Sequence, residues 1–241
     1  METILKWADD DGSFKRQESK FRGTISQEGS FKPEARRYVL YVSMACPWAH
    51  RALIVRVMKG LEDVIEVAVV HYLLDKEGIF FILGWYFDKS DSPYPLTTRD
   101  PVFNANYLSE IYKASDPEYK GRFTVPVLFD KLTKQIVNNE SSDIIRIFNS
   151  SFNSICKNPE LDLVPKGILA EIDTTNEWIY NEFNNGVYKA GFATSQNEYE
   201  KNATFVFNAL EKINDKLGQS TFFHGDFVTE TDIRIFTTAI R

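Results

Sequence analysis

A cysteine in this sequence stands where a strand pattern changes into a helix pattern. Residues 38–43 alternate β-branched and aromatic side chains, which favours a strand. Cys46 follows in a short loop, and Pro47 occupies the position where proline favours the first turn of a helix. The first amides of a helix lack intrahelical partners and carry the positive end of its dipole, so they favour a thiolate over a thiol. We therefore expect a lowered pKa and enhanced reactivity for Cys46.

The number and spacing of the cysteines limit the thiol reactions that are open to Cys46. A lone cysteine is often a small buried core residue, but the order of strand, loop, Cys-Pro and helix favours a reactive thiol. A dithiol oxidoreductase would carry Cys-x-x-Cys, and the second position here is Ala49. Because no resolving thiol lies beside Cys46, its thiolate is expected to exchange with an external thiol, of which glutathione is the obvious small cellular one. The second cysteine, Cys156, lies in a predicted linker and is interpreted as incidental.

Composition excludes several classes of function. The 241 residues are 43% apolar with a formal net charge of −6, which is ordinary for a globular protein and gives no electrostatic footprint for nucleic acid. Two cysteines in a chain of this length fit a reducing, cytoplasmic location. Residues 1–11 lack the apolar core of a signal peptide, and no apolar run is long enough to span a membrane. His50, His71 and His224 have no metal-ligand spacing, so no metal is expected.

The elements that must position Cys46 form a predicted βαβ unit. A helix over 48–60 follows the first strand. Residues 64–72 are rich in β-branched side chains, which predicts a second strand parallel to the first. Residues 78–108 predict a long irregular loop, and a helix is expected over 105–114.

A predicted hairpin follows this unit. Residues 122–130 and 134–141 are two short apolar runs joined by a polar turn. Pro126 stands inside the first run, and its place before an apolar strand favours a cis-proline that shapes a site. A helix capped by Ser141 or Ser142 is expected to run to about residue 149. The order β-α-β-α-β-β-α is that of a thioredoxin-like α/β domain.

The remaining segments complete the predicted organisation. The thioredoxin-like domain spans 37–150, and residues 1–36 are interpreted as an ordered arm laid over it, with a disordered tail as the alternative. Residues 150–165 are polar and contain prolines, which is typical of a linker. Residues 165–241 predict an all-helical domain, with a capping-box relative at 229–232. One of its predicted apolar stripes consists of Phe205, Leu210, Ile213 and Leu217.

Several motifs together resemble one enzyme family. They are Cys-Pro-Trp-Ala-His-Arg at 46–51, Gly-Trp-Tyr-Phe at 84–87, Arg-Phe-Thr-Val-Pro-Val-Leu at 122–128, Asn-Glu-Ser-Ser at 139–142 and Asn-Gly-Val-Tyr-Lys-Ala-Gly-Phe-Ala at 185–193. With a thioredoxin-like domain followed by a helical one, the chain resembles the cytosolic glutathione transferases. Within these it is most similar to the glutathionyl-hydroquinone reductases of the Xi class, close to the omega class, and especially to the fungal omega-like members. The resemblance covers nearly the whole chain.

The resemblance implies roles for residues on the thioredoxin-like domain. Cys46 matches the nucleophile, Trp85 matches a residue packed on glutathione, and Arg122 matches a side chain near a glutathione carboxylate. Val125, just before the presumed cis-Pro126, would pair its backbone with the cysteinyl part of glutathione, as an added strand does.

The same resemblance assigns the remaining site residues. Phe123 and Thr124 belong to the glutathione-binding segment. Glu140 would receive the α-ammonium of the γ-glutamyl group, while Ser141 and the following helix N-terminus would bind its α-carboxylate. Tyr188 matches the hydroxyl that hydrogen-bonds the quinol and moves a proton.

Each of these residues also has a plainer interpretation when taken alone. Trp85 could be an ordinary core residue, because large aromatic side chains are usually buried. Arg122 and Glu140 could be solvated surface charges, and Tyr188 could be a core or rim residue. Their joint occurrence in family order favours the functional interpretation.

The resemblance also sets expectations for the end of the chain and for assembly. The sequence stops at Arg241, where the family continues through further helices that carry a second active-site tyrosine and much of the dimer contact. We therefore expect the helical glutathione-transferase domain to be truncated here, with the thiol chemistry surviving better than the quinone site. The family pairs, which implies a homodimer.

The implied activity is that of a glutathione-dependent thiol transferase. It would reduce glutathionyl-hydroquinones to hydroquinones through a mixed disulfide between Cys46 and glutathione, with glutathione as co-substrate. One alternative is an omega-like enzyme that acts as a dehydroascorbate reductase or a deglutathionylating thioltransferase. Another is a non-catalytic glutathione-binding protein. In each case the expected partner is a small molecule, and neither nucleic acid nor a membrane is expected.

Overall fold

A computed structural model describes residues 8–72, 85–88 and 96–241, and the chain divides into two compact units. The first unit contains Gln17–Leu161, and the second contains Asp162–Arg241 together with residues 8–16. The segment expected to form an N-terminal arm is therefore shared between the two units. Among the described residues, none of the helices combines the length and the apolar composition that crossing a bilayer requires.

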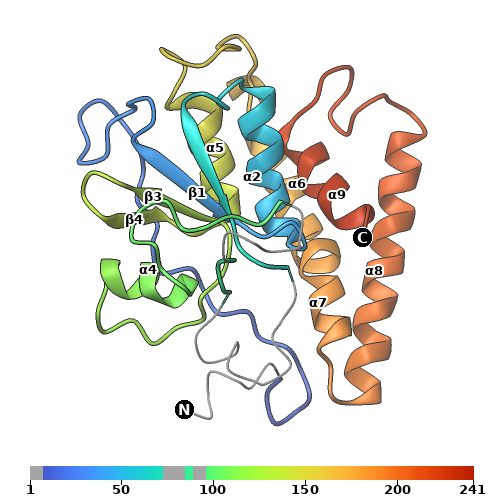
Figure 1. Cartoon of the computed structure of the whole chain (residues 1–241). Coiled ribbons are helices and arrows are strands. Elements are labelled where there is room, and N and C mark those ends of the chain that lie inside the picture. The colour runs from blue at the N-terminus through green and yellow to red at the C-terminus, as the bar shows by residue number, and fades with distance from the viewer. Residues whose placement is uncertain (1–7, 73–84, 89–95) are drawn as a thin grey trace. The chain divides into compact units, whose positions relative to one another are not determined.

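The first unit is built on a four-stranded mixed sheet (Figure 1). Its strands are β1 (Tyr38–Val42), β2 (Ile65–Val69), β3 (Val127–Asp130) and β4 (Gln135–Asn138), in the order β2-β1-β3-β4. The predicted parallel pair is confirmed, since β1 runs parallel to β2, with Leu40 opposite Val67. The predicted hairpin is also confirmed, because β3 pairs antiparallel with both β1 and β4.

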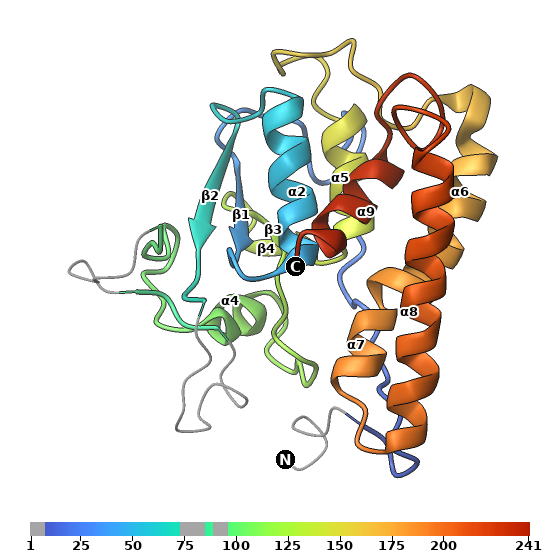
Figure 2. The same cartoon turned by 90° about the vertical axis from the view of Figure 1, so that its right-hand side faces the viewer.

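The apolar segment Tyr38–Val42 forms the buried strand β1 near the middle of the sheet. All five residues of β1 are buried, which is the pattern of a central strand whose sheet is covered on both faces. Helices α2 (Pro47–Met58) and α5 (Ser141–Ser150) lie side by side in this unit, and α4 (Leu108–Ser115) packs against β4 (Figures 1 and 2). The sequence-based helix boundaries at 48–60 and 105–114 are each displaced from these by one to three residues.

A buried ion pair joins two of the central strands. Arg37, just before β1, donates from Nε to Oδ1 of Asp130 at 2.9 Å, and Thr133 donates to the other carboxylate oxygen at 2.8 Å. Burial by itself would raise the pKa of Asp130, but the hydrogen bonds from Arg37, Thr133 and the Leu132 amide, together with the charge of Arg37, hold that pKa below its usual value. The hydrogen bond with Asp130 raises the pKa of Arg37 in turn.

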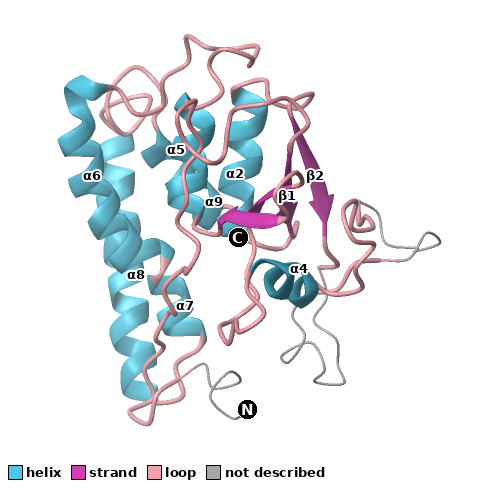
Figure 3. Ribbon diagram, turned by 90° about the vertical axis from the view of Figure 1, so that its left-hand side faces the viewer, coloured by secondary structure: helices cyan, strands magenta, loops and turns pink. Residues whose placement is uncertain are grey.

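The second unit is helical in its described C-terminal part, as the sequence predicts (Figure 3). Its elements are η1 (Lys166–Ile168), α6 (Leu169–Trp178), the π-helical η2 (Ile179–Asn184), α7 (Gly186–Gly191), α8 (Gln196–Leu217) and α9 (Glu230–Ala239). The predicted capping box of α9 is confirmed, since the Thr229 amide donates to Oδ2 of Asp232 at 2.8 Å.

The apolar stripe predicted for α8 is wrong for two of its four residues. Phe205 and Leu217 are 45% and 39% exposed, whereas Ile213 is buried and Leu210 packs beside it. The core of this unit is formed by Ile179, Phe183, Ala209, Ile213, Phe223 and Ile235. The spacing of apolar residues on α8 fits more than one face, and the contacts with η2 and α7 decide which face is buried.

Candidate active site

Cys46 occupies the position that the sequence predicts for it. It is the N-cap of α2, in extended backbone conformation, and Pro47 is the first helical residue. The loop from β1 is closed by the Cys46 amide, which donates to the Ser43 carbonyl at 3.0 Å, while the His50 amide donates to the Cys46 carbonyl at 3.0 Å. The thiol is half-buried and lies at the positive end of the helix dipole. These are the conditions that make a cysteine nucleophilic.

The thiol faces the segment that enters β3. The Cys46 Sγ lies 3.5 Å from the carbonyl oxygen of Val125. The Val125–Pro126 peptide bond is cis, which confirms the prediction for Pro126. A peptide that paired with the backbone of Val125 would therefore bring its own side chain within reach of the Cys46 sulfur.

The segment before Val125 is held by tyrosines. The Tyr119 hydroxyl donates to the Arg122 carbonyl at 2.9 Å, and the Tyr112 hydroxyl donates to the Thr124 carbonyl at 2.8 Å. The Phe123 ring lies 5.5 Å from the Tyr112 ring, centroid to centroid. Burial raises the pKa of both tyrosines, so both stay protonated donors at neutral pH. Arg122 and Phe123 are half-buried, and Thr124 is exposed.

The N-terminus of α5 carries the second predicted cluster. Sequence reasoning expected Ser141 or Ser142 to cap this helix, and that prediction is wrong, because the N-cap is Glu140. Its Oε1 accepts from the Ser142 amide and from the Ser142 hydroxyl, each at 3.1 Å, and from the Ser141 hydroxyl at 3.4 Å. A carboxylate and a helix N-terminus thus stand side by side, which suits a ligand that carries an ammonium next to a carboxylate.

Sequence reasoning missed Arg51, which lies beneath this cluster. Its side chain is fully buried on α2, and its Nη1 donates to the Ser141 hydroxyl at 3.4 Å. The guanidinium also lies 4.4 Å from the ring centre of Trp48. A buried cation behind Ser141 adds positive potential where an anionic group would bind. The signal in the sequence was an arginine among the apolar residues of the predicted helix.

Trp85 is half-buried, and its main chain is hydrogen-bonded to the first residue of α4. Its carbonyl accepts from the Leu108 amide at 2.7 Å. Its sequence neighbour Gly84 lies outside the described residues, as do residues 78–83 and 89–95 of the loop expected over 78–108. The role of Trp85 against a ligand stays a prediction.

Tyr188 lies on α7, within the second unit. Its ring is covered by the Arg16 guanidinium, 4.4 Å from the ring centre, and Phe14 and Phe192 stack beside it at 6.2 and 6.0 Å. Arg16 is itself fixed by a hydrogen bond from its Nε to Oδ1 of Asn185, at 2.7 Å. Sequence reasoning had named Tyr188 but not Arg16, because 172 positions separate the two residues in the chain. The ring therefore has a defined orientation in its unit.

The described residues contain no cluster of side chains suited to binding a metal ion. Across the described parts of the chain, no group of three or more histidine, cysteine, aspartate or glutamate side chains is placed to hold a metal ion. Cys156, in the first unit, is half-buried, and its sulfur lies 3.9 Å from the carbonyl oxygen of Asn153.

Comparison with known proteins gives a consistent result. Residues 45–151 match the family described as glutathione S-transferase, N-terminal domain. The chain is 48% identical over 244 residues to a glutathione S-transferase omega-like 2 from Schizosaccharomyces pombe, covering 99% of this chain and 75% of that protein. It is 44% identical to the glutathionyl-hydroquinone reductase YqjG from Escherichia coli, covering 95% of this chain and 70% of that protein.

Solved structures agree with these similarities. The crystal structure of the glutathione-S-transferase Xi from Phanerochaete chrysosporium superposes with a TM-score of 0.91 at 47% identity, covering 97% of this chain and 73% of that one. The glutathione-bound structure of YqjG from Escherichia coli superposes with a TM-score of 0.85 at 43% identity, covering 96% of this chain and 73% of that one.

Proposed function

Because the chain belongs to the Xi class of glutathione transferases, the family of the glutathionyl-hydroquinone reductases, we propose that it reduces glutathionyl-hydroquinones with glutathione as co-substrate. In the first step the Cys46 thiolate attacks the glutathione sulfur of the conjugate. The bond between that sulfur and the ring carbon breaks, the ring carbon takes up a proton, and hydroquinone leaves. A second glutathione then attacks the mixed disulfide, which releases oxidised glutathione and restores the Cys46 thiolate.

The observation that carries this proposal is the contact between Cys46 and Val125. The sulfur lies at a helix N-terminus and 3.5 Å from a carbonyl that an extended peptide can pair with. A glutathione cysteine held against Val125 would have its sulfur in line for exchange with Cys46. No second thiol follows at Ala49, so exchange with an external thiol is the route open to this cysteine.

We assign glutathione recognition to residues around this contact. Glu140 would accept the α-ammonium, and Ser141, at the start of α5, would donate to the α-carboxylate. Arg122 would pair with the other carboxylate of the tripeptide. Trp85 would pack on the bound molecule, beside the segment of Phe123 and Thr124 that leads to Val125.

Tyr188 would donate to the quinol oxygen and assist the transfer of a proton to the ring carbon. The geometry that supports this role is the fixed orientation of its ring between Arg16 and the two phenylalanines. We further propose the domain boundaries 37–150 and 165–241, a homodimer and a cytoplasmic location. These follow from the motif order, the family resemblance and the scarcity of cysteine.

Replacement of the sulfur tests the activity. Cys46→Ser should abolish hydroquinone release from a glutathionyl-hydroquinone and retain glutathione binding, whereas the control Cys156→Ser should keep full activity. Equal activity in Cys46→Ser would defeat the assignment. Glutathione binding without turnover in the unchanged protein would identify a binding protein instead. Turnover of dehydroascorbate but not of the conjugate would identify the omega-like activity.

A further inference from the structure

The arm segment of the first unit forms an extra edge along the sheet. The Gly23 amide donates to the Val137 carbonyl at 2.8 Å, and the Asn139 amide donates to the Phe21 carbonyl at 3.0 Å. Arg22 pairs antiparallel with Asn138 at the end of β4. These main-chain bonds fix the register of the arm on the strand that leads directly into Glu140.

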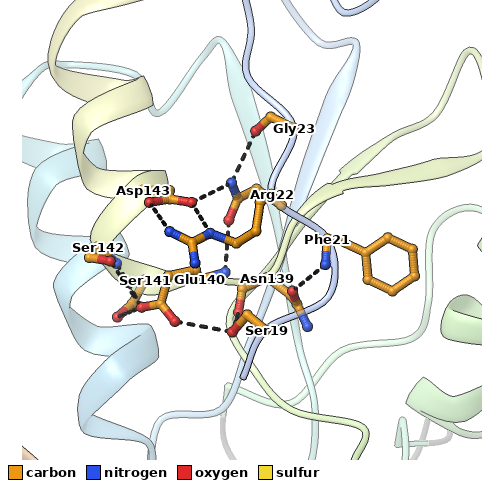
Figure 4. A network of polar contacts seen from close by, with 10 residues as sticks. Ser19, Phe21, Arg22, Gly23, Asn139, Glu140, Ser141, Ser142 and Asp143 are labelled. Carbon is orange, nitrogen blue, oxygen red and sulfur yellow. Dashed lines mark hydrogen bonds and ion pairs between the residues drawn. The ribbon is translucent and has the colours of Figure 1, made fainter. Parts of the chain in front are cut away.

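Side chains lock the same segment in place, as Figure 4 shows. The Phe21 amide donates to Oδ1 of Asn139 at 3.1 Å, and Nδ2 of Asn138 donates to the Gly23 carbonyl at 3.0 Å. Arg22 forms an ion pair with Asp143 in the first turn of α5, with Nη2 to Oδ1 at 2.8 Å. The arm is thus tied to both the strand and the helix that flank Glu140.

The fixed register brings Ser19 to the carboxylate of Glu140. The Ser19 hydroxyl lies 3.0 Å from Oε2 of Glu140 and 3.3 Å from the Asn139 carbonyl (Figure 4). The other oxygen, Oε1, is the one that the amide and hydroxyl of Ser142 occupy. Ser19 therefore bonds to Oε2, which is the carboxylate oxygen that Ser141 and Ser142 leave open to a cation.

We propose that Ser19 is a positioning residue of the γ-glutamyl subsite, which acts by orienting Oε2 of Glu140 toward the α-ammonium of glutathione. This inference rests on the proposed function, because it presumes that glutathione is the ligand. The hydroxyl also has lone pairs that can accept from the same ammonium while its hydrogen stays on Oε2. The arm thus supplies part of the ligand site in addition to covering the edge of the sheet.

Glutathione affinity in the inactive Cys46→Ser protein tests this role without turnover. Adding Ser19→Ala removes one hydrogen bond to a charged group, so we expect Kd for glutathione to rise roughly tenfold. For the des-amino analogue of glutathione, which has no α-ammonium, Kd should change less than about twofold, because its affinity never used Oε2. Ser19→Thr keeps the hydroxyl and should restore the affinity for glutathione.

Matched controls separate positioning from loss of structure. Ser13→Ala removes a serine hydroxyl that bonds to Asp11 instead of Glu140, and it should leave both affinities unchanged. Thermal unfolding of each variant checks that the fold persists. If Ser19→Ala weakens glutathione and the des-amino analogue equally, or weakens neither, the positioning role is refuted while the proposed function stands. If the Cys46→Ser parent binds no glutathione, both fail.

Discussion

Replacement of Glu140 by glutamine separates the charge of this residue from its capping role. In Glu140→Gln the side-chain oxygen can still accept from the Ser142 amide, so α5 keeps its cap. The negative charge that we assign to the α-ammonium of glutathione is lost. A hydrogen bond to a charged group contributes about 1.5–3 kcal/mol net, and the half-buried position of Glu140 places the loss near the lower end.

The expected magnitude follows from that free energy. At about 1.4 kcal/mol per factor of ten, a loss of about 1.5–2 kcal/mol lowers kcat/KM roughly 10- to 30-fold. The same decrease should appear when the glutathionyl-hydroquinone is varied and when glutathione is varied, because we assign the γ-glutamyl group of both substrates to Glu140. Steady-state kinetics with each substrate in turn measures both values.

A comparison with alanine completes the design. Glu140→Ala removes the cap as well and should cost an additional ~0.5–2 kcal/mol in the free energy of unfolding, whereas Glu140→Gln should cost little. If Glu140→Gln keeps kcat/KM within twofold for both substrates, the assignment of Glu140 to the ammonium is refuted. If the glutamine variant unfolds as readily as the alanine variant, the capping account is wrong.

Two further predictions concern stability and proton transfer. Asp130→Asn should lower the free energy of unfolding by about 3–5 kcal/mol at pH 7, because the buried Arg37 loses its buried anion and keeps the 3.4 Å contact with the exposed Glu34. The folded pKa of Asp130 is lowered, so the stability that its charge contributes is complete above the unfolded pKa of about 3.9. That contribution is lost as the pH falls through the folded pKa. Urea unfolding should therefore give the variant and the unchanged protein similar free energies of unfolding in strong acid. Tyr188→Phe should slow hydroquinone release in a single turnover by roughly a hundredfold or more and leave glutathione binding unchanged, and equal release rates would remove Tyr188 from the mechanism.

Local signals in the sequence explain what could be predicted. The step from an apolar strand to Cys-Pro and a helix is encoded within about a dozen residues, and the structure places Cys46 at the N-cap with Pro47 behind it. The cis bond before Pro126 was likewise predictable, because Thr-Val-Pro stands before an apolar strand in a thioredoxin-like order of elements. These local patterns account for the strand order of the first unit and for the position of Cys46.

Long-range contacts explain what could not be predicted. Ser19 meets Glu140 across 121 positions of sequence, and a serine in a polar arm carries no local sign of that contact. Arg51 is the last residue of the Cys-Pro-Trp-Ala-His-Arg motif in the sequence, but its burial behind Ser141 depends on the packing of α2 against α5. On α8 the spacing suggested that Phe205 was buried, and only tertiary packing selects the face that Ile213 occupies.

The most direct test of the account is the site of glutathione attachment in a single turnover. The protein is mixed with a glutathionyl-hydroquinone in the absence of free glutathione, and intact-mass and peptide mass spectrometry follow the product. The account predicts one glutathione per chain, attached to Cys46, with an equal amount of hydroquinone released, and loss of the adduct when glutathione is added. Attachment to Cys156 instead, or hydroquinone release with no adduct on Cys46, would contradict it.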